Sequence, residues 1–389
     1  MKTQLNIDEL VSRLKSALPA YDQPLALHEP RFQGNEWLYV KDCLDSGWVS
    51  SVGEYVNRFE RMLADYVGVN HAIAVVNGTA ALHICLLLAG VKSGDEIIIP
   101  SLTFIATANA ISYCGAIPLF ADADERTLGI DAEKLDAFLA DNAEIRDGLC
   151  FNRHTGRRIA ALMPMHTFGH PVDIDALMHV AEKWKLPLVE DAAESLGSFY
   201  KGRHTGGFGK IAGLSFNGNK IITTGGGGAI LTNDAELAKQ AKHLTTTARI
   251  PHKWSFMHDM VGYNYRLPNI NAALGCAQME SLSEYVERKR DLARRYATTL
   301  DGLDGVRFVC EPEHSRSNYW LNTLLLDRAD FAHRDDVLEH LNHAGLSARP
   351  AWVLLHKLPM FSECPRMDLS VAEDLEQRII NIPSSVVLA

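Results

Sequence analysis

The sequence lacks several features that would assign it to other protein classes. It has no CxxC pair, and its seven cysteines are scattered along the chain, so neither a zinc cluster nor a disulfide framework is predicted. Basic residues number 38 against 48 acidic ones, and the resulting net charge of -10 excludes a general nucleic-acid binder. The longest apolar run, residues 80–91, is too short to span a bilayer, and the N-terminus has no signal-peptide pattern. We therefore expect a cytoplasmic protein with reduced thiols that binds neither nucleic acid nor a membrane.

What the sequence does contain is a repeated alternation of strand-like and helix-like segments. Hydrophobic residues make up 47% of the 389 residues, which is enough for a large core. Short runs rich in Ile and Val alternate with helical patterns, which predicts an α/β fold with a mostly parallel sheet. Such sheets bind ligands at the carboxyl ends of their strands. The seven predicted strands are residues 72–76, 96–100, 117–121, 159–164, 186–190, 212–216 and 229–232.

The character of the chain changes near residue 250. A long charged helical stretch, residues 269–300, precedes the strand-like segments VRFVC and TLLLD and a further helix near residues 334–344. This pattern predicts a large domain over residues 1–250, which includes an N-terminal helix, and a smaller α+β domain over residues 251–389. The N-terminal helix is interpreted as a packed decoration, with an apolar face formed by Ile7, Leu10, Val11, Leu14 and Leu18.

The first candidate site is the segment Asn77-Gly78-Thr79-Ala80, which lies between a predicted strand and the helix that follows it. A helix N-terminus offers free N–H groups and a positive dipole end, and both suit a phosphate. Gly78 permits close approach of the backbone, and Thr79 adds a hydroxyl group. The alternative is that Thr79 is only a helix cap, and this segment alone favours that alternative.

Two further candidates follow later strands. Asp191 ends the run LPLVED, where a carboxylate can hold a cationic ring nitrogen, although an isolated acid there is more often a cap or a solvated turn. Lys220 lies in a turn after the strand AGLSF, and Gly225 to Gly228 follow it. A lysine that forms a Schiff base must be held in place and partly desolvated, and glycines let the backbone pack around a bulky group. The alternative is a surface lysine beside a flexible hairpin, which needs only one or two glycines.

Two other patterns are set aside. Residues 207–212 (GFGKIA) fit GxGxxA, but they precede a strand, whereas the dinucleotide fingerprint requires a strand, then glycines, then a helix. His166 and His170 lie four residues apart, but Gly169 and Pro171 indicate a loop and no third ligand is suggested. No metal site is predicted.

The order of a phosphate-type helix start, a strand-end Asp191 and a strand-end Lys220 resembles one known family. It is similar to the pyridoxal-phosphate-dependent sugar aminotransferases of the DegT/DnrJ/EryC/StrS group. The resemblance implies fold type I, like that of aspartate aminotransferase, in which a cofactor-binding large domain with a mostly parallel seven-stranded sheet is followed by a smaller α+β C-terminal domain. The matching stretches are SGWVSSVGEYVNRFE, VNGTAALHICLLLAGVKSGDEIIIPSLTFIATANAI, MHTFGHPVDID, VEDAAESLGSFY, GLSFNGNKIITTGGGGAIL and GYNYRLPNINAALGCAQ.

The resemblance implies a role for each matching residue. Lys220 would bind pyridoxal 5'-phosphate as a Schiff base and then move a proton, and Asp191 would pair with the pyridine nitrogen, so both are expected to be catalytic. Phe104 would stack on the ring, and Glu194 would lie near the ring hydroxyl, where many relatives have Gln. The remaining cofactor contacts would come from Gly78, Thr79, Ala80, Ser215, Asn217 and, across a homodimer with shared active sites, from Asn264 of the neighbouring subunit.

One departure from the family pattern is visible. Many relatives carry Gly-Glu-Gly-Gly after the lysine, whereas this chain has Gly225 to Gly228. The difference affects no residue with an implied catalytic role, so we expect it to change only local contacts of the loop.

A finer resemblance concerns the substrate. The stretches LHEPRFQGNEWLYVKDCLDSGWVSS, GLCFNRHTGRRIAAL and RPAWVLLHKLPMF are similar to the legionaminic-acid-type branch of the family. This branch implies transfer of the amino group of L-glutamate to C4 of a nucleotide-linked 4-keto-6-deoxy-N-acetylhexosamine. The products would be the 4-amino sugar and 2-oxoglutarate, formed by ping-pong chemistry in deoxyamino-sugar and polysaccharide biosynthesis.

Other interpretations stay open. The acceptor can be a different ketosugar, including a free or cyclitol ketone, or the chain can be a regulatory homologue that binds the cofactor without turnover. A sugar 3-dehydratase is disfavoured, because those relatives have His in place of the lysine. The sequence does not determine whether the carrier is UDP or GDP. Six residues either line the sugar-nucleotide cleft or merely pack: Trp48, His28, Arg31, Arg349, Trp352 and His356.

Overall fold

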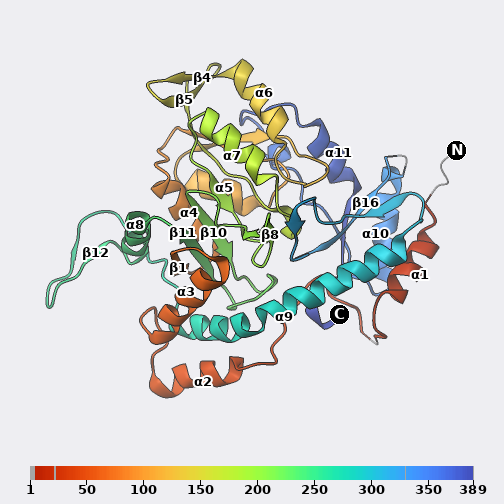
Figure 1. The fold of residues 1–389 in the computed structure, drawn as a ribbon, viewed down its shortest axis with the longest axis horizontal. Helices are drawn as coiled ribbons and strands as arrows, with labels where there is room; N and C mark the ends of the chain where they lie inside the picture. Colours follow the sequence, from red (N-terminus) through yellow and green to blue (C-terminus); the bar gives the residue numbers. More distant parts are fainter. Residues whose placement is uncertain (1–4, 22, 329, 389) are drawn as a thin grey trace.

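One β-sheet runs through the larger part of the molecule, and helices cover both of its faces (Figure 1). The computed structural model describes residues 5–21, 23–328 and 330–388. Two isolated parallel bridges, Leu162 to Leu188 and Met165 to Asp191, join a four-stranded and a five-stranded sheet. In spatial order the strands that form the body of this sheet are β1 (His71–Val75), β11 (Gly228–Thr232), β10 (Ile211–Ser215), β7 (Val189–Asp191), β6 (Arg158–Leu162), β2 (Glu96–Pro100) and β3 (Ile117–Ala121).

Within the described residues, these seven strands match the seven predicted ones, and the sheet is mostly parallel as predicted. Strand β11 is the exception, because it runs antiparallel to both β1 and β10. A hairpin of β4 (Ala143–Arg146) and β5 (Leu149–Asn152) continues the sheet beside the start of β6. The register sets Asp191 at the end of β7 beside Gly213 of β10, so the two strands end close together.

Side chains alternate between the two faces of the sheet, and both faces are buried. On β1, Ile73 and Val75 belong to one hydrophobic core, whereas Ala72 and Ala74 belong to the other. Because both faces are covered, the strands read as continuous apolar runs. The first core is covered by α4 (Gly78–Leu88), α5 (Ile105–Tyr113), α6 (Ala132–Asn142), α7 (Ile174–Lys183) and α8 (Ala235–Thr245). The second core is covered by α3 (Glu54–Val67) and α9 (Asn269–Leu300), and α2 (Glu36–Ser46) packs outside against α9.

The long helix α9 connects the two ends of the molecule (Figure 1). Its first half packs against α2 and α3, and its second half shares a core with α1 (Ile7–Ser16). Leu10 and Leu14 of α1 are buried together with Leu341, so the N-terminal helix packs with the C-terminal part of the chain. The domain division at residue 250 stays a prediction, and the first four residues lie outside the described part.

A second, antiparallel sheet forms the C-terminal part of the chain, together with two helices. Its strands, in spatial order, are β14 (Val306–Phe308), β16 (Asn322–Leu326), β18 (Ile379–Ile382) and β17 (Arg349–Pro350). The helices are α10 (Arg334–His343) and α11 (Ser370–Arg378). The side chains of Leu321, Leu325 and Ile379 from this part share a core with Leu102 and Phe168 of the large sheet's loops. This shared core fixes the C-terminal sheet against the loops that follow the parallel strands.

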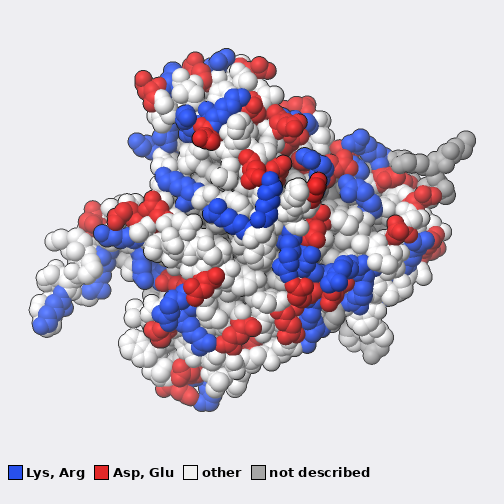
Figure 2. Space-filling model, in the orientation of Figure 1, with Lys and Arg blue, Asp and Glu red and all other residues white. Residues whose placement is uncertain are grey.

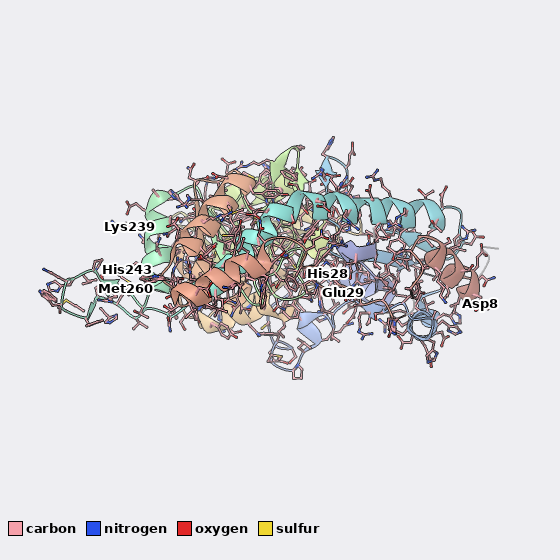
Figure 3. All side chains as sticks on the ribbon, turned by 90° about the horizontal axis from the view of Figure 1, so that it is seen from below. Asp8, His28, Glu29, Lys239, His243 and Met260 are labelled. Atoms are coloured by element: carbon pink, nitrogen blue, oxygen red, sulfur yellow. The ribbon has the colours of Figure 1, made fainter. Side chains whose placement is uncertain are left out.

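Short elements complete the chain. A small sheet contains β15 (Ser315–Arg316), β8 (Phe199–Tyr200) and β9 (Arg203–His204), and the 3-10 turns are η1 (Thr167–Gly169), η2 (Phe331–His333), η3 (Leu355–Lys357) and η4 (Val386–Leu388). Strands β12 (Arg249–Ile250) and β13 (Met257–His258) lie in residues 249–261, here called the arm, which projects from the body (Figure 1). Figure 3 places His243 and Met260 at the base of the arm, far from Asp8 of α1.

The thiols and the charged side chains are the remaining general features of the chain. All seven cysteines are free thiols, and four of them are buried. Acidic and basic side chains are intermixed on the face that Figure 2 shows. Among the described helices, none is both long and apolar enough to cross a membrane.

The packing of α9 against α3 generates a first prediction. A Cβ atom at Gly275 of α9 would lie 2.7 Å from Cε2 of Phe59 and 2.8 Å from Cγ2 of Thr224, and Phe59 is fully buried. We expect Gly275→Val to lower the free energy of unfolding by about 1–3 kcal/mol through overpacking, measured by urea-induced unfolding. Gly226→Ala is the control, because its Cβ would have no neighbour within 4 Å, and its change should stay within about 0.5 kcal/mol. Equal losses in both variants would contradict this account of the interface.

Candidate active site

A cavity of about 290 Å³ lies where the carboxyl ends of β7 and β10 meet the N-terminus of α4. Two tryptophans from the C-terminal part of the chain, Trp320 and Trp352, close its other side. Of the predicted cofactor contacts, Ala80 and Asn264 do not line the cavity. Those that do are Gly78, Thr79, Phe104, Asp191, Glu194, Ser215, Asn217 and Lys220.

The start of α4 forms one wall. Helix α4 begins at Gly78, and its cap is Asn77, whose Oδ1 accepts the N–H of Ala80 at 2.7 Å. The alternative in which Thr79 caps the helix is therefore wrong, and the Ala80 amide, predicted to hold a phosphate, already has a partner. A Cβ at Gly78 would lie 2.8 Å from Cβ of Ser215, so only glycine lets the helix start this close to the end of β10.

The glycine run after Lys220 serves the same junction. A Cβ at Gly228, the first residue of β11, would lie 2.5 Å from the carbonyl oxygen of Asn77. The strand and the helix start therefore touch backbone to backbone. Gly228, the last residue of the run, is therefore required by the junction between β11 and the start of α4.

Asp191 lies at the base of the cavity and is 2% exposed. Its Oδ2 accepts the hydroxyl of Thr107 at 2.7 Å, and its Oδ1 accepts the N–H of Ala193 at 3.2 Å. Burial raises the pKa of this carboxyl, while the Thr107 and Ala193 hydrogen bonds and the Lys220 charge act in the opposite direction. Asp191 forms no ion pair with any residue that the structure describes, so a cationic group in the cavity would complete its environment.

Lys220 reaches into the same cavity from the turn after β10. Its Nζ donates to Oε1 of Glu194 at 3.1 Å and lies 3.8 Å from the ring centroid of Trp320. The side chain of Lys220 is 12% exposed, which meets the requirement for a held and partly desolvated lysine. The Trp320 ring is fixed in turn, because its Nε1–H donates to the carbonyl oxygen of Asn219 at 2.6 Å.

Glu194 completes the polar base of the cavity. Its Oε2 accepts the N–H of Phe168 at 3.0 Å, and its Oε1 faces Lys220. Burial raises the pKa of Glu194 to about 7, although the charge and the hydrogen bond of Lys220 lower it. Glu190, the residue before Asp191, has a different task. It accepts the N–H groups of Phe208 and Gly209 in GFGKIA and of the preceding Gly206, and it contacts His166. That loop therefore binds a protein carboxylate, in agreement with its exclusion as a dinucleotide fingerprint.

Aromatic rings surround the mouth of the cavity. Phe104, which is 47% exposed, lies edge-on to Trp352 with 6.2 Å between ring centroids. Trp352 packs in turn against the buried ring of Phe168 at 5.0 Å. An exposed ring at the opening of a polar cavity is a surface on which a flat ligand can stack.

The six residues that could line the sugar-nucleotide cleft lie in different parts of the structure, and only one of them lines the cavity. Trp352 lines the cavity, and His28 lies near Asn219 and Lys220, in the middle of the molecule (Figure 3). His356 has a structural partner on each ring nitrogen, namely Ser101 at 2.8 Å and Glu373 at 3.2 Å. The remaining three, Trp48, Arg31 and Arg349, do not line the cavity.

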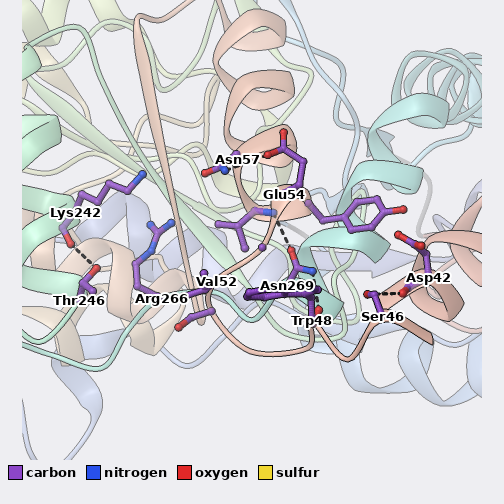
Figure 4. Close-up of a pocket in the computed structure, with 14 residues that line it drawn as sticks. Asp42, Ser46, Trp48, Val52, Glu54, Asn57, Lys242, Thr246, Arg266 and Asn269 are labelled. Atoms are coloured by element: carbon purple, nitrogen blue, oxygen red, sulfur yellow. Dashed lines mark hydrogen bonds between the residues drawn. The ribbon is translucent and has the colours of Figure 1, made fainter. Parts of the chain in front are cut away.

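A second, larger hollow of about 700 Å³ contains Trp48 and lies beside α2, α3 and the end of α8 (Figure 4). Its buried polar groups are already paired. Arg266 donates to Glu60 and to the carbonyl oxygen of Ala74, and Asn269 donates to the carbonyl oxygen of Trp48 at 2.7 Å (Figure 4). We infer no ligand site in this hollow.

Among the residues of the cavity that sequence reasoning missed, Thr107 and Trp320 contact its charged side chains. Thr107 lies in α5, three residues after Phe104, within a stretch that matches the family. Its position one helical turn after a predicted site residue could have indicated that it also faces the cavity. Trp320 comes from the segment before β16, and no local pattern connects it to Lys220. No cluster of three or more metal-ligating side chains occurs in the described residues.

The donor set fits the cofactor that the family resemblance implies. A buried carboxylate without a cation matches a protonated ring nitrogen, and the lysine amine matches an aldehyde. Thr79 and Ser215 flank the helix start, which is the type of position that binds phosphate.

Comparison with known proteins is consistent with this geometry. A GDP-perosamine synthase from Caulobacter vibrioides is 39% identical over 363 residues, covering 92% of this chain and 93% of that protein. The putative pyridoxal phosphate-dependent aminotransferase EpsN from Bacillus subtilis is also 39% identical, over 92% of this chain and 90% of its own. The crystal structure of the aminotransferase TlmJ from Streptoalloteichus hindustanus superposes with a TM-score of 0.84 at 28% identity, covering 94% and 95% of the two chains.

The chain also matches the sequence pattern of a whole protein family. The DegT/DnrJ/EryC1/StrS aminotransferase family matches residues 30–389, which includes every residue of the cavity. The fold is fold type I, as the resemblance implied. The chain therefore belongs to the DegT/DnrJ/EryC1/StrS family of pyridoxal-phosphate-dependent aminotransferases.

Proposed function

We propose that this aminotransferase moves the amino group of L-glutamate to C4 of a nucleotide-linked 4-keto-6-deoxy-N-acetylhexosamine of the legionaminic-acid type. One observation carries the proposal: the Lys220 amine and the Asp191 carboxylate line a single cavity at the carboxyl ends of neighbouring strands. The relatives named for GDP-perosamine support a nucleotide-linked acceptor. The N-acetyl group and the C4 position come from the sequence resemblance to the legionaminic-acid-type branch.

Five residues of the cavity have a defined task in this proposal. Pyridoxal phosphate, when bound, supplies an aldehyde that condenses with amines and a ring that accepts electrons from a neighbouring C–H bond. Asp191 keeps the ring nitrogen protonated, and the start of α4 with Thr79 and Ser215 holds the phosphate. Lys220 holds the cofactor and then moves a proton, while Phe104 at the mouth covers one face of the ring. Holding these groups in one geometry supplies much of the acceleration.

The exposed apolar residues support the homodimer. Many large apolar side chains of helix α2, the loop after it and the arm are exposed to solvent. Such exposed apolar side chains are typical of a surface that binds another protein. A second copy of the chain that covers them would also bring Asn264, which is exposed at the base of the arm, toward a neighbouring active site. The exposed residues are Trp37, Leu38, Leu44, Trp48, Val49, Val52, Trp254, Phe256, Met257, Met260 and Val261.

The role of Lys220 is tested by substitution. Lys220→Ala should abolish the covalent attachment of the cofactor and its yellow absorbance, and reduce turnover by at least about a thousandfold. Borohydride reduction followed by peptide mass analysis locates the attachment. Lys210→Ala is the matched control, because this exposed lysine precedes β10 and does not line the cavity. Retention of cofactor and activity in Lys220→Ala would remove this lysine from the mechanism.

The acceptor is tested with a panel of sugars. Purified enzyme with L-glutamate is offered UDP- and GDP-linked 4-keto-6-deoxy-N-acetylhexosamines, and the same GDP-linked hexose without the N-acetyl group. We expect amination of the N-acetylated sugars on one of the two carriers, detected by the mass of the product. Conversion of only the sugar without the N-acetyl group would contradict the branch assignment but not the aminotransferase reaction.

The shared active site is tested by complementation between two inactive variants. Lys220→Ala and Asn264→Ala subunits are co-expressed with different tags, and the heterodimer is isolated. If Asn264 serves the neighbouring subunit, one of the two sites contains both native residues, and the heterodimer should recover roughly half of the wild-type activity. If Asn264 serves its own subunit, no site is intact and the heterodimer is no more active than the Asn264→Ala homodimer. Sedimentation of the wild-type protein gives the oligomeric state independently.

A further inference from the structure

We propose that Glu194 is a catalytic proton acceptor, which takes the proton that the Lys220 ammonium group must lose before its amine can act as a base. This inference rests on the proposed role of Lys220 as the group that moves the substrate proton. The sequence resemblance gave Glu194 only a contact with the cofactor ring. The structure adds a direct hydrogen bond between the two reacting side chains.

The geometry provides a short and enclosed path. Nζ of Lys220 lies 3.1 Å from Oε1 of Glu194, and the two side chains are 12% and 1% exposed. The Trp320 ring lies against the other side of the same amine, and the Phe168 N–H holds the second oxygen of Glu194. Both partners are therefore fixed, and water has little access to the contact.

The proposed step balances without any further reactant. A lysine amine in water is protonated at neutral pH, and an ammonium group has no lone pair with which to accept a proton. One N–H bond of the Lys220 ammonium breaks and one O–H bond forms on Oε1 of Glu194. The charged pair becomes a neutral amine and a neutral carboxylic acid. Burial of Glu194 favours this exchange, because it penalises the charged carboxylate and so increases its affinity for a proton.

The environment of Glu194 is tuned to exchange a proton near neutrality. Burial raises its pKa to about 7, and the negative charge of Asp191 acts in the same direction. Lys220 and the Phe168 N–H oppose this shift. A carboxyl group with this proton affinity can both accept and return a proton at physiological pH.

The neighbouring ionisable groups do not replace Glu194 in this task. Asp191 accepts hydrogen bonds from Thr107 and Ala193, and in the described part of the chain it makes none with Lys220. Burial, followed by the charges of Lys289 and Lys220, lowers the pKa of His28 well below its usual value, so its ring is neutral. Lys289 donates to the carbonyl oxygens of Trp320 and Ser384. His166 accepts the Val172 N–H on Nδ1 and so carries its proton on Nε2, toward Glu190.

An amide at position 194 would change the contact in a defined way. The carboxylate offers one oxygen to the Phe168 N–H and one to Lys220, whereas glutamine has a single oxygen. With that oxygen on Phe168, the amide N–H₂ group would face Lys220 and favour the neutral amine. Glu194→Gln should therefore make the Lys220 amine more reactive in the cofactor-free enzyme and remove the proton acceptor at the same time.

The first test uses the cofactor-free enzyme and measures no turnover. Lys220 is labelled with a trace of acetic anhydride at a series of pH values, and the labelled peptide is quantified by mass spectrometry. Removing the opposite charge of Glu194 favours the neutral Lys220 amine, so the labelling rate at neutral pH should rise about tenfold. An unchanged labelling profile in Glu194→Gln overturns the proposal.

The second test is the pH profile of kcat for the loaded enzyme. In the wild type, Glu194 should take a proton from solvent as the pH falls, because burial raises the pKa of its carboxyl, and turnover should fall with it, because the acceptor is then occupied. In Glu194→Gln this acid limb should disappear or move by at least about one unit to lower pH. An acid limb at the same pH as in the wild type overturns the proposal, even if the labelling changes.

Controls separate this inference from the proposed function. Glu311→Gln removes a carboxylate that pairs with Arg290 outside the cavity, and it should keep both wild-type profiles. If Glu194→Gln fails to fold, Glu194→Asp keeps a carboxyl group and should keep the acid limb with a lower rate. Loss of that limb in Glu194→Asp with full cofactor content overturns the proposal. Borohydride trapping of the cofactor on a residue other than Lys220 would instead overturn the proposed function.

Discussion

The parallel pairing of β7 with β10 is the constraint on which the site depends. It aligns Asp191 with Gly213, so the acid at the end of one strand lies beside the strand that leads into Lys220. The start of α4 closes the cavity only because Gly78 and Gly228 leave no side chain between the helix, β10 and β11. A slip in register by one residue would turn Asp191 to the other face of the sheet and separate the acid from the amine.

The charges in the cavity follow from the same burial. Three ionisable groups, Asp191, Glu194 and Lys220, share a small volume, and only one of them is a cation. Burial alone would disfavour both carboxylates, and the pKa values of both are raised. Lys220 compensates one of them directly, whereas the other is compensated by hydrogen bonds from Thr107 and Ala193. This difference suits Asp191 to a lasting pairing with a bound cation and Glu194 to the exchange of a proton.

The fold was largely accessible from the sequence, because both faces of the parallel sheet are covered. Covered strands are continuous apolar runs, and each of the seven predicted runs overlaps a strand of the sheet. Strand-end positions then indicated Asp191 and Lys220. The packing of α1 was not accessible, because an apolar stripe shows that a helix packs but does not show against what, and α1 packs with residues near the other end of the chain.

Local hydrogen bonding set a second limit on what the sequence could predict. The segment Asn77 to Ala80 contains two residues able to cap α4, and spacing alone favoured Thr79. The structure has Asn77 as the cap, which occupies the Ala80 amide and leaves the Thr79 side chain facing the cavity. The choice depends on backbone dihedral angles at the helix start, and these are set by the contact with β10 and β11. Such a choice is decided by tertiary structure, which no local pattern contains.

Trp320 brings the C-terminal part of the chain into the cavity that contains Lys220. Its ring lies against the Lys220 amine, its indole N–H is bound to Asn219, and its carbonyl oxygen is bound by the buried Lys289 of α9. Because α9 packs against both ends of the molecule, it holds this ring relative to the large sheet. A shift of the C-terminal sheet would therefore change the solvation of the lysine amine. Through Trp320, the C-terminal part of the chain covers one side of the Lys220 amine and limits the access of water to it.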